Sequence, residues 1–200
     1  MKTIEYYFSP SSPWAYMGHD RLLKIAEKHG AQLEPRPFAL GAAIFPISGG
    51  LPLPKRAPQR QAYRLFELRR WSEHLGLPLN IHPKYFPVSD DQAASLMIAA
   101  AHNIEGKDAA LRLLGATFRA LWAEDRNTSD PNTLIEIAGE CQLDGQALYA
   151  GQDEARRFYD QCTKQAIERQ VFGAPWYVYQ DEPFWGQDRL DFLDRALAKG

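Results

Sequence analysis

Hydrophobic and polar residues alternate at the start of the chain with the period of a β-strand. Within residues 2–8, three apolar side chains fall on one face: Ile4, Tyr6 and Phe8. Because successive strand residues point to opposite faces, this alternation predicts a strand. Residues 31–38 form a second predicted strand, in which Pro35 and Pro37 supply no backbone N–H donor. We therefore expect the second strand at the edge of a sheet or at a bulge.

A helix is predicted between these two strands. Ser12 is placed to cap it, and Pro13 stands at its first position, where the missing N–H costs nothing. An apolar stripe with helical spacing follows, and Gly30 ends it. The order strand–helix–strand predicts a parallel pair of strands joined by a right-handed crossover.

The next hundred residues do not continue this alternation. Residues 41–58 are rich in glycine and proline and are expected to form a loop. Residues 89–92 read as a capping box, and Asp130–Pro131 repeats the cap-and-proline start of the first helix. Apolar spacing predicts five helices, approximately at residues 65–75, 93–101, 111–122, 131–139 and 153–166.

The strand pattern returns near the end of the chain. Residues 175–179 alternate, residues 180–183 predict a hairpin turn, and residues 184–185 form the returning strand. A last helix follows Asp188, with three leucines on one side: Leu190, Leu193 and Leu197. The chain thus predicts an α/β fold in which one sheet is assembled from both ends. We place this domain at residues 1–42 and 165–200, and an all-helical insertion at residues 43–164.

Composition and charge exclude several classes of protein. Hydrophobic residues make up 45% and charged residues 24% of the 200 positions, which is typical of a globular protein. The net charge of −2 argues against non-specific nucleic-acid binding, which depends on clustered positive charge. No stretch approaches the roughly 18 apolar residues of a membrane span. The first residues lack a secretory core, so we expect a cytoplasmic protein without membrane or nucleic-acid partners.

The cysteines and histidines do not suggest a metal or redox centre. Cys141 and Cys162 lack CxxC spacing, and in a reducing compartment both are expected to be small buried hydrophobic residues. The five histidines include no HExxH pair, so no metal site is predicted. Aromatic residues make up 12% of the chain, which favours an aromatic-lined pocket for a flat organic ligand.

Three junctions between elements would converge if both ends of the chain share one sheet. They are residues 9–16, the loop before Pro175, and residues 185–188. Ser12 lies at a helix N-terminus, where free N–H groups and the helix dipole favour an anion such as a thiolate. Its hydroxyl can donate to such a thiolate or simply cap the helix, and spacing alone favours the cap.

The other two junctions carry candidate ligand groups. Ala174–Pro175 is a candidate cis-proline turn, which would expose the peptide groups of Ala174 to an extended peptide ligand. Asp188 is either a negative charge that complements the dipole of the last helix or a partner for an ammonium group. Trp185 is either a core residue or a ligand platform.

Positively charged side chains follow the predicted loop. Such a run normally forms a solvated helix face, although any one of its arginines could bind a carboxylate. These arginines are Arg56, Arg60, Arg64, Arg69 and Arg70.

Four segments in register resemble one known family. They are residues 6–16 (YYFSPSSPWAY), 63–71 (YRLFELRRW), 171–176 (VFGAPW) and 184–190 (FWGQDRL). The chain resembles 2-hydroxychromene-2-carboxylate isomerases, relatives of kappa-class glutathione transferases within the DsbA-like thioredoxin superfamily. The resemblance covers the chain from end to end and implies a thioredoxin-like domain carrying a helical insertion.

The resemblance also implies an activity. It is the glutathione-dependent interconversion of 2-hydroxychromene-2-carboxylate and trans-o-hydroxybenzylidenepyruvate, a step of naphthalene-type catabolism. Ser12 matches the family's catalytic serine, which would hold the glutathione sulfur as a thiolate. Ala15 stands where redox relatives have their second cysteine, so dithiol–disulfide exchange at this turn is excluded. The expected partners are glutathione and a small aromatic carboxylate, and the expected assembly is a homodimer.

Further residues are assigned by the same resemblance. Ala174 and Pro175 would pair with the glutathione backbone, with Ser11 nearby, and Gln187 and Asp188 would hold its γ-glutamyl end. Trp14 and Trp185 would line the substrate pocket, and no metal is implied.

Three features of the chain depart from the family pattern or remain open. Arg60 stands where the family usually has lysine, with a plausible role on the glycine carboxylate, and Glu67 matches an acidic position of kappa relatives. Residues 42–53 lack the asparagine expected beside the substrate. Two alternatives therefore stay open: a glutathione transferase acting on another electrophile, and a non-catalytic thioredoxin-like binding module.

Overall fold

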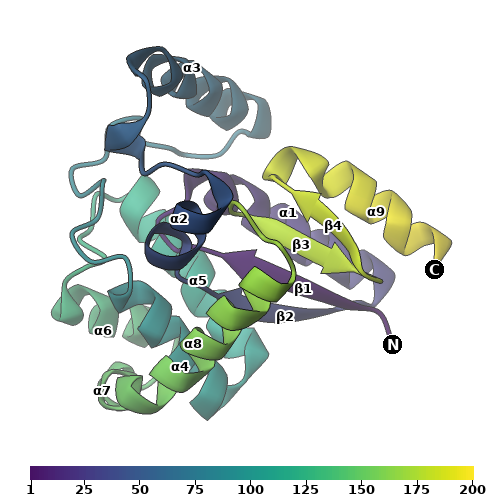
Figure 1. Cartoon of the computed structure of the whole chain (residues 1–200). Coiled ribbons are helices and arrows are strands. Elements are labelled where there is room, and N and C mark those ends of the chain that lie inside the picture. Colours follow the sequence, from purple (N-terminus) through teal and green to yellow (C-terminus); the bar gives the residue numbers. More distant parts are fainter.

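A four-stranded sheet in the order β2-β1-β3-β4 forms the centre of the computed structural model, which describes residues 1–200. Its strands are β1 (Thr3–Phe8), β2 (Gln32–Pro37), β3 (Trp176–Tyr179) and β4 (Glu182–Trp185). β1 pairs in parallel with β2 and antiparallel with β3, and β3 pairs antiparallel with β4. The two ends of the chain therefore build one sheet, which confirms the predicted α/β fold (Figure 1). β2 lies at the edge, as its two prolines require.

Helices surround this sheet (Figure 1). They are α1 (Pro13–His29), α2 (Phe45–Ser48), α3 (Pro58–Leu75), α4 (Ala93–Glu105), α5 (Lys107–Trp122), α6 (Pro131–Glu140), α7 (Gly145–Ala150), α8 (Gln152–Glu168) and α9 (Leu190–Lys199). α1 packs against α5 and α9, while α4, α5 and α8 contact β2. α3 stands apart at the top of Figure 1, with one end near the start of α9. None of these helices is long and apolar enough to cross a lipid bilayer.

The ends of α1 follow the predicted capping chemistry. Ser12 is the N-cap with extended backbone angles, and its Oγ accepts the N–H of Ala15 at 3.2 Å. Pro13 occupies the first helical position. Gly30 ends the helix with φ +59°, a conformation that favours glycine. Asp130 caps α6 in the same way, accepting the N–H of Thr133 at 2.8 Å.

The hydrophobic core continues from the sheet into the helical part of the chain. One cluster of 36 buried residues includes Phe8 of β1, Leu22 of α1, Phe118 of α5 and Leu193 of α9. A second cluster of 7 residues, including Tyr7, lies on the other face of the sheet. Alternate residues of β1 therefore enter the two clusters, so both faces of the central strand are covered. The boundaries proposed at residues 42 and 165 stay a prediction.

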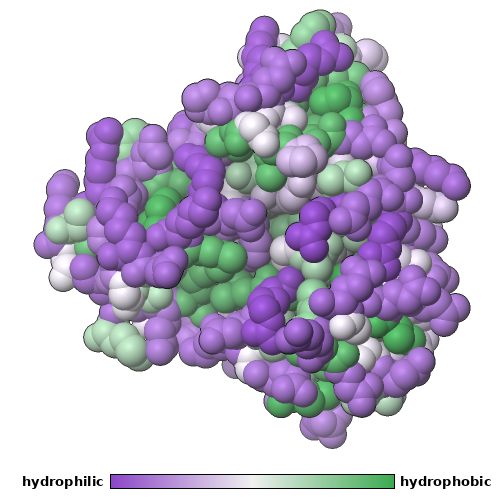
Figure 2. All heavy atoms as spheres, turned by 180° about the vertical axis from the view of Figure 1, so that it is seen from behind, coloured by the Kyte–Doolittle hydropathy of each residue, from purple (hydrophilic) through white to green (hydrophobic).

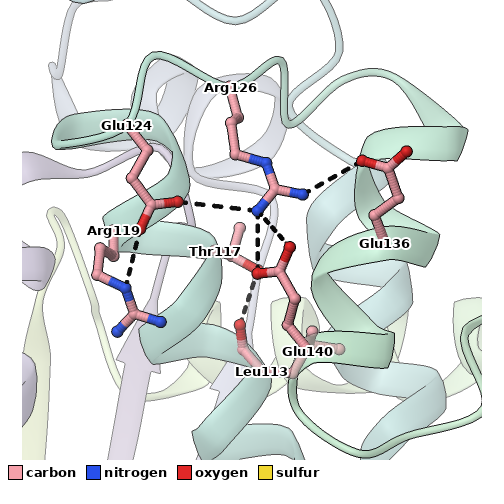
Figure 3. Close-up of polar contacts among 7 residues, drawn as sticks. All are labelled: Leu113, Thr117, Arg119, Glu124, Arg126, Glu136 and Glu140. Carbon is pink, nitrogen blue, oxygen red and sulfur yellow. Dashed lines mark hydrogen bonds and ion pairs between the residues drawn. The ribbon is translucent and has the colours of Figure 1, made fainter.

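A network of charged side chains joins the end of α5 to α6 (Figure 3). Arg126 Nη1 lies 2.8 Å from Glu140, and its Nη2 lies 3.4 Å from Glu136. Glu124 is 3.8 Å from Arg126 and 3.1 Å from Arg119. Because Arg126 is only 22% exposed and contacts three carboxylates, this network fixes the loop better than an isolated surface pair would.

Several local predictions were wrong. Residues 41–58 are not all loop, because they contain a π-helical turn (Leu40–Ile44), α2 and a 3-10 turn (Leu53–Lys55). The helix α7 was not foreseen. The capping box fails because Asp90, not Ser89, accepts the N–H groups at the start of α4. α4 also extends beyond the expected residue 101, to Glu105.

The end of the chain and the cysteines need smaller corrections. The hairpin turn is only two residues long, Gln180 and Asp181, both with positive φ. A 3-10 turn (Gln187–Arg189) precedes α9, so residues 187–188 do not begin the α-helix itself. Both cysteines are free thiols. Cys162 is buried as predicted, but Cys141 is partly exposed.

Gly18 tests how tightly α1 packs on the turn before α9. A Cβ atom at this position would lie 2.8 Å from Tyr177 Oη and 3.0 Å from Gln187 Cβ. We expect Gly18→Ala to lower the free energy of unfolding by about 1–3 kcal/mol, because the added methyl overpacks this contact. The helical Gly139 meets nothing within 4 Å, so Gly139→Ala should stabilise the protein by up to ~1 kcal/mol. Urea unfolding measures the stability of both variants. Equal stabilisation by the two changes would contradict the tight packing of Gly18 against Tyr177 and Gln187.

His19 makes the stability of the core depend on pH. It is 2% exposed, its Nε2 lies 3.1 Å from the carbonyl oxygen of Leu111, and its Nδ1 has no partner. Burial lowers the pKa of His19 to about 4. The unfolded chain therefore binds a proton before the folded protein does as pH falls below about 6.5. We expect this residue to cost about 3 kcal/mol of stability between pH 7 and pH 4.

The measurement is denaturant unfolding across this pH range. His19→Leu should flatten the decline in stability between pH 6.5 and pH 4. His82→Leu, at an exposed histidine, should keep the wild-type decline. A wild-type decline in His19→Leu would show that other groups cause it.

Candidate active site

A cleft of about 530 Å³ separates α3 from the segment between β4 and α9. The residues that line it are Trp14, Arg56, Gln59, Arg60, Tyr63, Arg64, Glu67, Trp71, Ala174, Trp185, Gly186, Gln187, Asp188 and Arg189. Six residues predicted for the site are among them: Trp14, Arg60, Ala174, Trp185, Gln187 and Asp188. The structure thus brings the expected segments of the chain together at one place.

A larger groove of about 780 Å³ lies between α1 and α5. It contains none of the predicted site residues and is bordered by charged side chains such as Asp20, Asp108 and Arg119. The rear face of the molecule is mostly hydrophilic, with hydrophobic residues gathered in its hollows (Figure 2).

Because the predicted site residues meet in the smaller cleft and not in the larger groove, we take the smaller cleft as the candidate active site.

Ser12 lies at the edge of this cleft and is not part of its lining. Its Oγ accepts the N–H of Ala15 and donates to the carbonyl oxygen of Ala174 at 3.4 Å. The N–H of Trp14, at the same helix start, makes no backbone hydrogen bond. The cap interpretation of Ser12 is confirmed, and its hydroxyl hydrogen is held only by a long hydrogen bond. This turn therefore presents one weakly held O–H and one free N–H.

Ser11 and Pro175 do not line the cleft. The Ser11 hydroxyl lies 3.1 Å from that of Ser9 and donates to Asp91 Oδ1 at 3.4 Å. Burial of the Asp91 carboxyl group is the main reason why its pKa lies above the ordinary value for aspartate. Ser11 thus fastens the turn to the start of α4.

The peptide bond between Ala174 and Pro175 is cis, as the sequence suggested. The N–H of Ala174 makes no backbone hydrogen bond, and Ala174 lines the cleft. The carbonyl oxygen of Pro175 accepts the N–H of Gly186 at 2.9 Å. This bond ties the turn at Pro175 to the turn before α9.

Gln187 is held from behind by a residue that sequence reasoning missed. Arg21 Nη1 donates to the side-chain Oε1 of Gln187 at 2.7 Å and to its backbone oxygen at 3.2 Å. Gln187 is 2% exposed, and Arg21 also lies 3.5 Å from Asp191. Because residues 21 and 187 are 166 positions apart, no local pattern announces this contact.

Asp188 and Trp185 stand on the same side of the cleft. Asp188 Oδ2 lies 2.7 Å from Arg189 Nη1. Trp185 is 52% exposed and packs edge-on against Phe172 at 4.7 Å, so it is not a core residue. A side chain at Gly173 would collide with the Trp185 indole. Glycine is therefore needed beside this exposed ring.

The run of arginines was expected to form a solvated face, which holds for the exposed Arg60, Arg69 and Arg70, whereas Arg56 and Arg64 are partly buried. Arg56, Arg60 and Arg64 line the cleft, and none makes an ion pair. Glu67, which also lines it, is taken by Arg70 at 2.7 Å. The four-residue spacing of Arg60 and Arg64 is the sequence signal that could have placed both on one side of α3. The cleft thus carries an excess of positive charge.

The described residues contain no group of three or more histidine, cysteine, aspartate or glutamate side chains that could hold a metal ion. The cleft instead offers cations, free backbone N–H groups and exposed aromatic rings. These are the groups that bind an anionic organic ligand.

The chain is similar to known proteins over almost its whole length. The family model of the DSBA-like thioredoxin domain matches residues 3–198. A 2-hydroxychromene-2-carboxylate isomerase of Sphingobium xenophagum is 32% identical over 98% of both chains. The human glutathione S-transferase kappa 1 is 20% identical over 99% of this chain and 92% of that protein.

A solved structure agrees with these relatives. The structure of a 2-hydroxychromene-2-carboxylate isomerase superimposes with a TM-score of 0.80 at 27% identity, covering 98% of this chain and 95% of that one. The protein therefore belongs to the DsbA-like thioredoxin family and, within it, to the family of 2-hydroxychromene-2-carboxylate isomerases.

Proposed function

We propose that this protein is a glutathione-dependent isomerase that interconverts 2-hydroxychromene-2-carboxylate and trans-o-hydroxybenzylidenepyruvate. The observation that carries the proposal is the 32% identity, over both whole chains, to an isomerase named for the first of these compounds. The cleft between α3 and the turn before α9 supplies the binding groups that such a reaction needs.

The cleft fits glutathione in charge and in hydrogen-bonding groups. Ala174 offers its free N–H and its carbonyl oxygen to the tripeptide backbone. Arg60, which has no protein partner, is placed to bind the glycine carboxylate, and Asp188 the γ-glutamyl ammonium. The Oε1 of Gln187 is already taken by Arg21, so Gln187 would contribute its remaining polar groups. The similarity to a kappa-class glutathione transferase supports this choice of cofactor.

Ser12 would hold the sulfur. Its hydroxyl can turn from the long bond to Ala174 and donate to a thiolate. The free N–H of Trp14 and the positive end of the α1 dipole favour the same negative charge. Bound reduced glutathione would supply a nucleophilic sulfur that adds to a conjugated carbon, permits rotation about the former double bond, and leaves again. Trp14 and Trp185 offer apolar faces beside this point.

Ala15 follows Ser12 where a dithiol enzyme needs its second sulfur, so this turn cannot carry a disulfide. Because the cytoplasm keeps glutathione reduced, we expect the protein to act there. A homodimer remains part of the proposal.

A second candidate function is glutathione transfer to another electrophile, which the kappa-class relative favours. Both functions share the glutathione site. They differ in the product, so chromene carboxylate absorbance with and without glutathione distinguishes them. A binding module without catalysis would show no affinity for glutathione in calorimetric titration.

Ser12→Ala tests the role of the hydroxyl. We expect kcat for the isomerisation to fall by roughly 10²-fold or more, because the sulfur loses its hydrogen-bond donor. The loss of the helix cap should lower stability by only ~1 kcal/mol. Steady-state kinetics and urea unfolding measure the two effects separately.

The matched control is Asp130→Ala, which removes the cap of another helix that also begins with proline. It should cost a similar ~1 kcal/mol and leave kcat unchanged. If Ser12→Ala unfolds the protein easily but retains high turnover in its folded fraction, Ser12 is only a cap.

Arg21→Met tests the support of the turn that carries Asp188. Removing the guanidinium leaves the buried Oε1 of Gln187 without a partner, so the turn should lose its fixed position. We expect KM for glutathione to rise about tenfold, with kcat changed less than about twofold, since the sulfur site is untouched. Arg195→Met, at an exposed arginine of α9, should leave both constants at wild-type values. A fall in kcat with unchanged KM would contradict this role of Arg21.

A further inference from the structure

Arg64 is a charged side chain without a partner in the folded protein. It lines the cleft, yet it donates no hydrogen bond and lies in no ion pair, although it is half-buried. Its nitrogen atoms are not among the side-chain atoms sealed in the interior without a partner. The guanidinium donors are therefore free and open to the cleft.

Two aromatic rings hold this guanidinium in place. Its central carbon lies 5.2 Å from the ring centroid of Phe86 and 5.8 Å from that of Trp122. These rings offer attractive faces but no anion, so they restrict the motion of Arg64 without neutralising it. Burial, followed by repulsion from Arg56, lowers the pKa of Arg64 to about 10. The protein thus maintains an uncompensated cation at this position.

The neighbouring charges do not compensate it. Glu67 pairs with Arg70, and Asp188 pairs with Arg189 through its Oδ2, which leaves its Oδ1 for the glutathione ammonium under the proposed function. Arg56 donates through its Nε to the carbonyl oxygen of Leu51, and Arg60 is assigned to glutathione under the proposed function. Of the three arginines, Arg64 alone has neither a hydrogen bond nor an assignment, so its flat donor group is available for a second anion. A planar guanidinium fits a carboxylate with two parallel hydrogen bonds.

We propose that Arg64 binds the carboxylate of the isomerase substrate and selects planar aromatic carboxylates, with the substrate ring lying among the exposed aromatic side chains of the cleft. This inference rests on the proposed function, which supplies the class of substrate. It assigns to α3 a carboxylate subsite distinct from the one that holds glutathione. Tyr63, the residue before Arg64, and Trp71, two turns after it, also line the cleft and supply apolar surface.

A purely structural role for Arg64 would be to fasten α3 to the rest of the protein through Phe86 and Trp122. The two roles differ in what a substitution changes. A fastening role affects all ligands of the cleft alike, whereas a carboxylate subsite distinguishes a charged ligand from a neutral one of the same shape.

The test compares Arg64→Gln and Arg64→Lys with Arg69→Gln, an exposed arginine of the same helix outside the cleft. The probes are 2-naphthoate and the neutral 2-naphthamide, titrated by tryptophan fluorescence with and without glutathione. We expect Arg64→Gln to weaken naphthoate binding at least tenfold and naphthamide binding less than twofold. Arg64→Lys should fall between, Arg69→Gln should match the wild type, and glutathione affinity should stay within twofold throughout.

A second measurement needs only the wild-type protein. Phenylglyoxal modifies accessible arginines, and mass spectrometry reports modification at Arg64. Naphthoate should protect Arg64, whereas naphthamide should not. This comparison decides the proposal even if Arg64→Gln does not fold.

Equal losses of affinity for naphthoate and naphthamide in Arg64→Gln would overturn the carboxylate subsite. Protection of Arg64 from phenylglyoxal by both probes would do the same, as would a wild-type protein that binds neither probe. Loss of glutathione affinity in Arg64→Gln would reassign Arg64 to the cofactor. If wild-type protein binds naphthoate through Arg64 but neither binds glutathione nor turns over the chromene carboxylate, the proposed function fails while the subsite stands.

Discussion

The register of three paired strands positions the wall of the candidate site that faces α3. Tyr7 of β1 lies opposite Trp176 of β3, and Trp176 lies opposite Trp185 of β4. The turn after β1, the cis-proline turn before β3 and the turn after β4 must therefore meet at one end of the sheet. The bond from the Gly186 N–H to the Pro175 carbonyl oxygen completes this arrangement. A shift of one residue in either pairing would turn the central side chains to the opposite face and separate these groups.

The features that sequence analysis predicted correctly depend on local chemistry. Ser12 and Asp130 each precede a proline and cap their helices, Gly30 ends α1, and the prolines of β2 place it at the sheet edge. Local patterns were sufficient because the interacting atoms lie within a few residues of each other. The meeting of both chain ends followed from the strand order, since the insertion between them has no strand pattern.

The features that were missed depend on distant contacts. Arg21 reaches Gln187 across 166 positions, and whether Arg64 faces solvent or the cleft depends on Phe86 and Trp122 from other segments. The start of α4 shows that the sequence can also fail to predict a contact between near neighbours. Ser89 and Asp90 are both acceptable caps, and the fold selects Asp90, with the hydroxyl of Ser129 accepting its N–H. Propensity alone does not choose between such neighbours.

The two walls of the cleft are built very differently. The wall of Ala174 and Gln187 lies in the turns beside β3 and β4, and Arg21 of α1 holds Gln187 in place, whereas α3 has a single fully buried side chain, Leu68. Substitutions on the cleft-facing side of α3 therefore disturb little of the interior, while changes in the opposite wall propagate into the core. The sequence of this one helix can accordingly vary among related enzymes and change the ligand-facing surface of the cleft, while the opposite wall, which is tied to the core, stays the same.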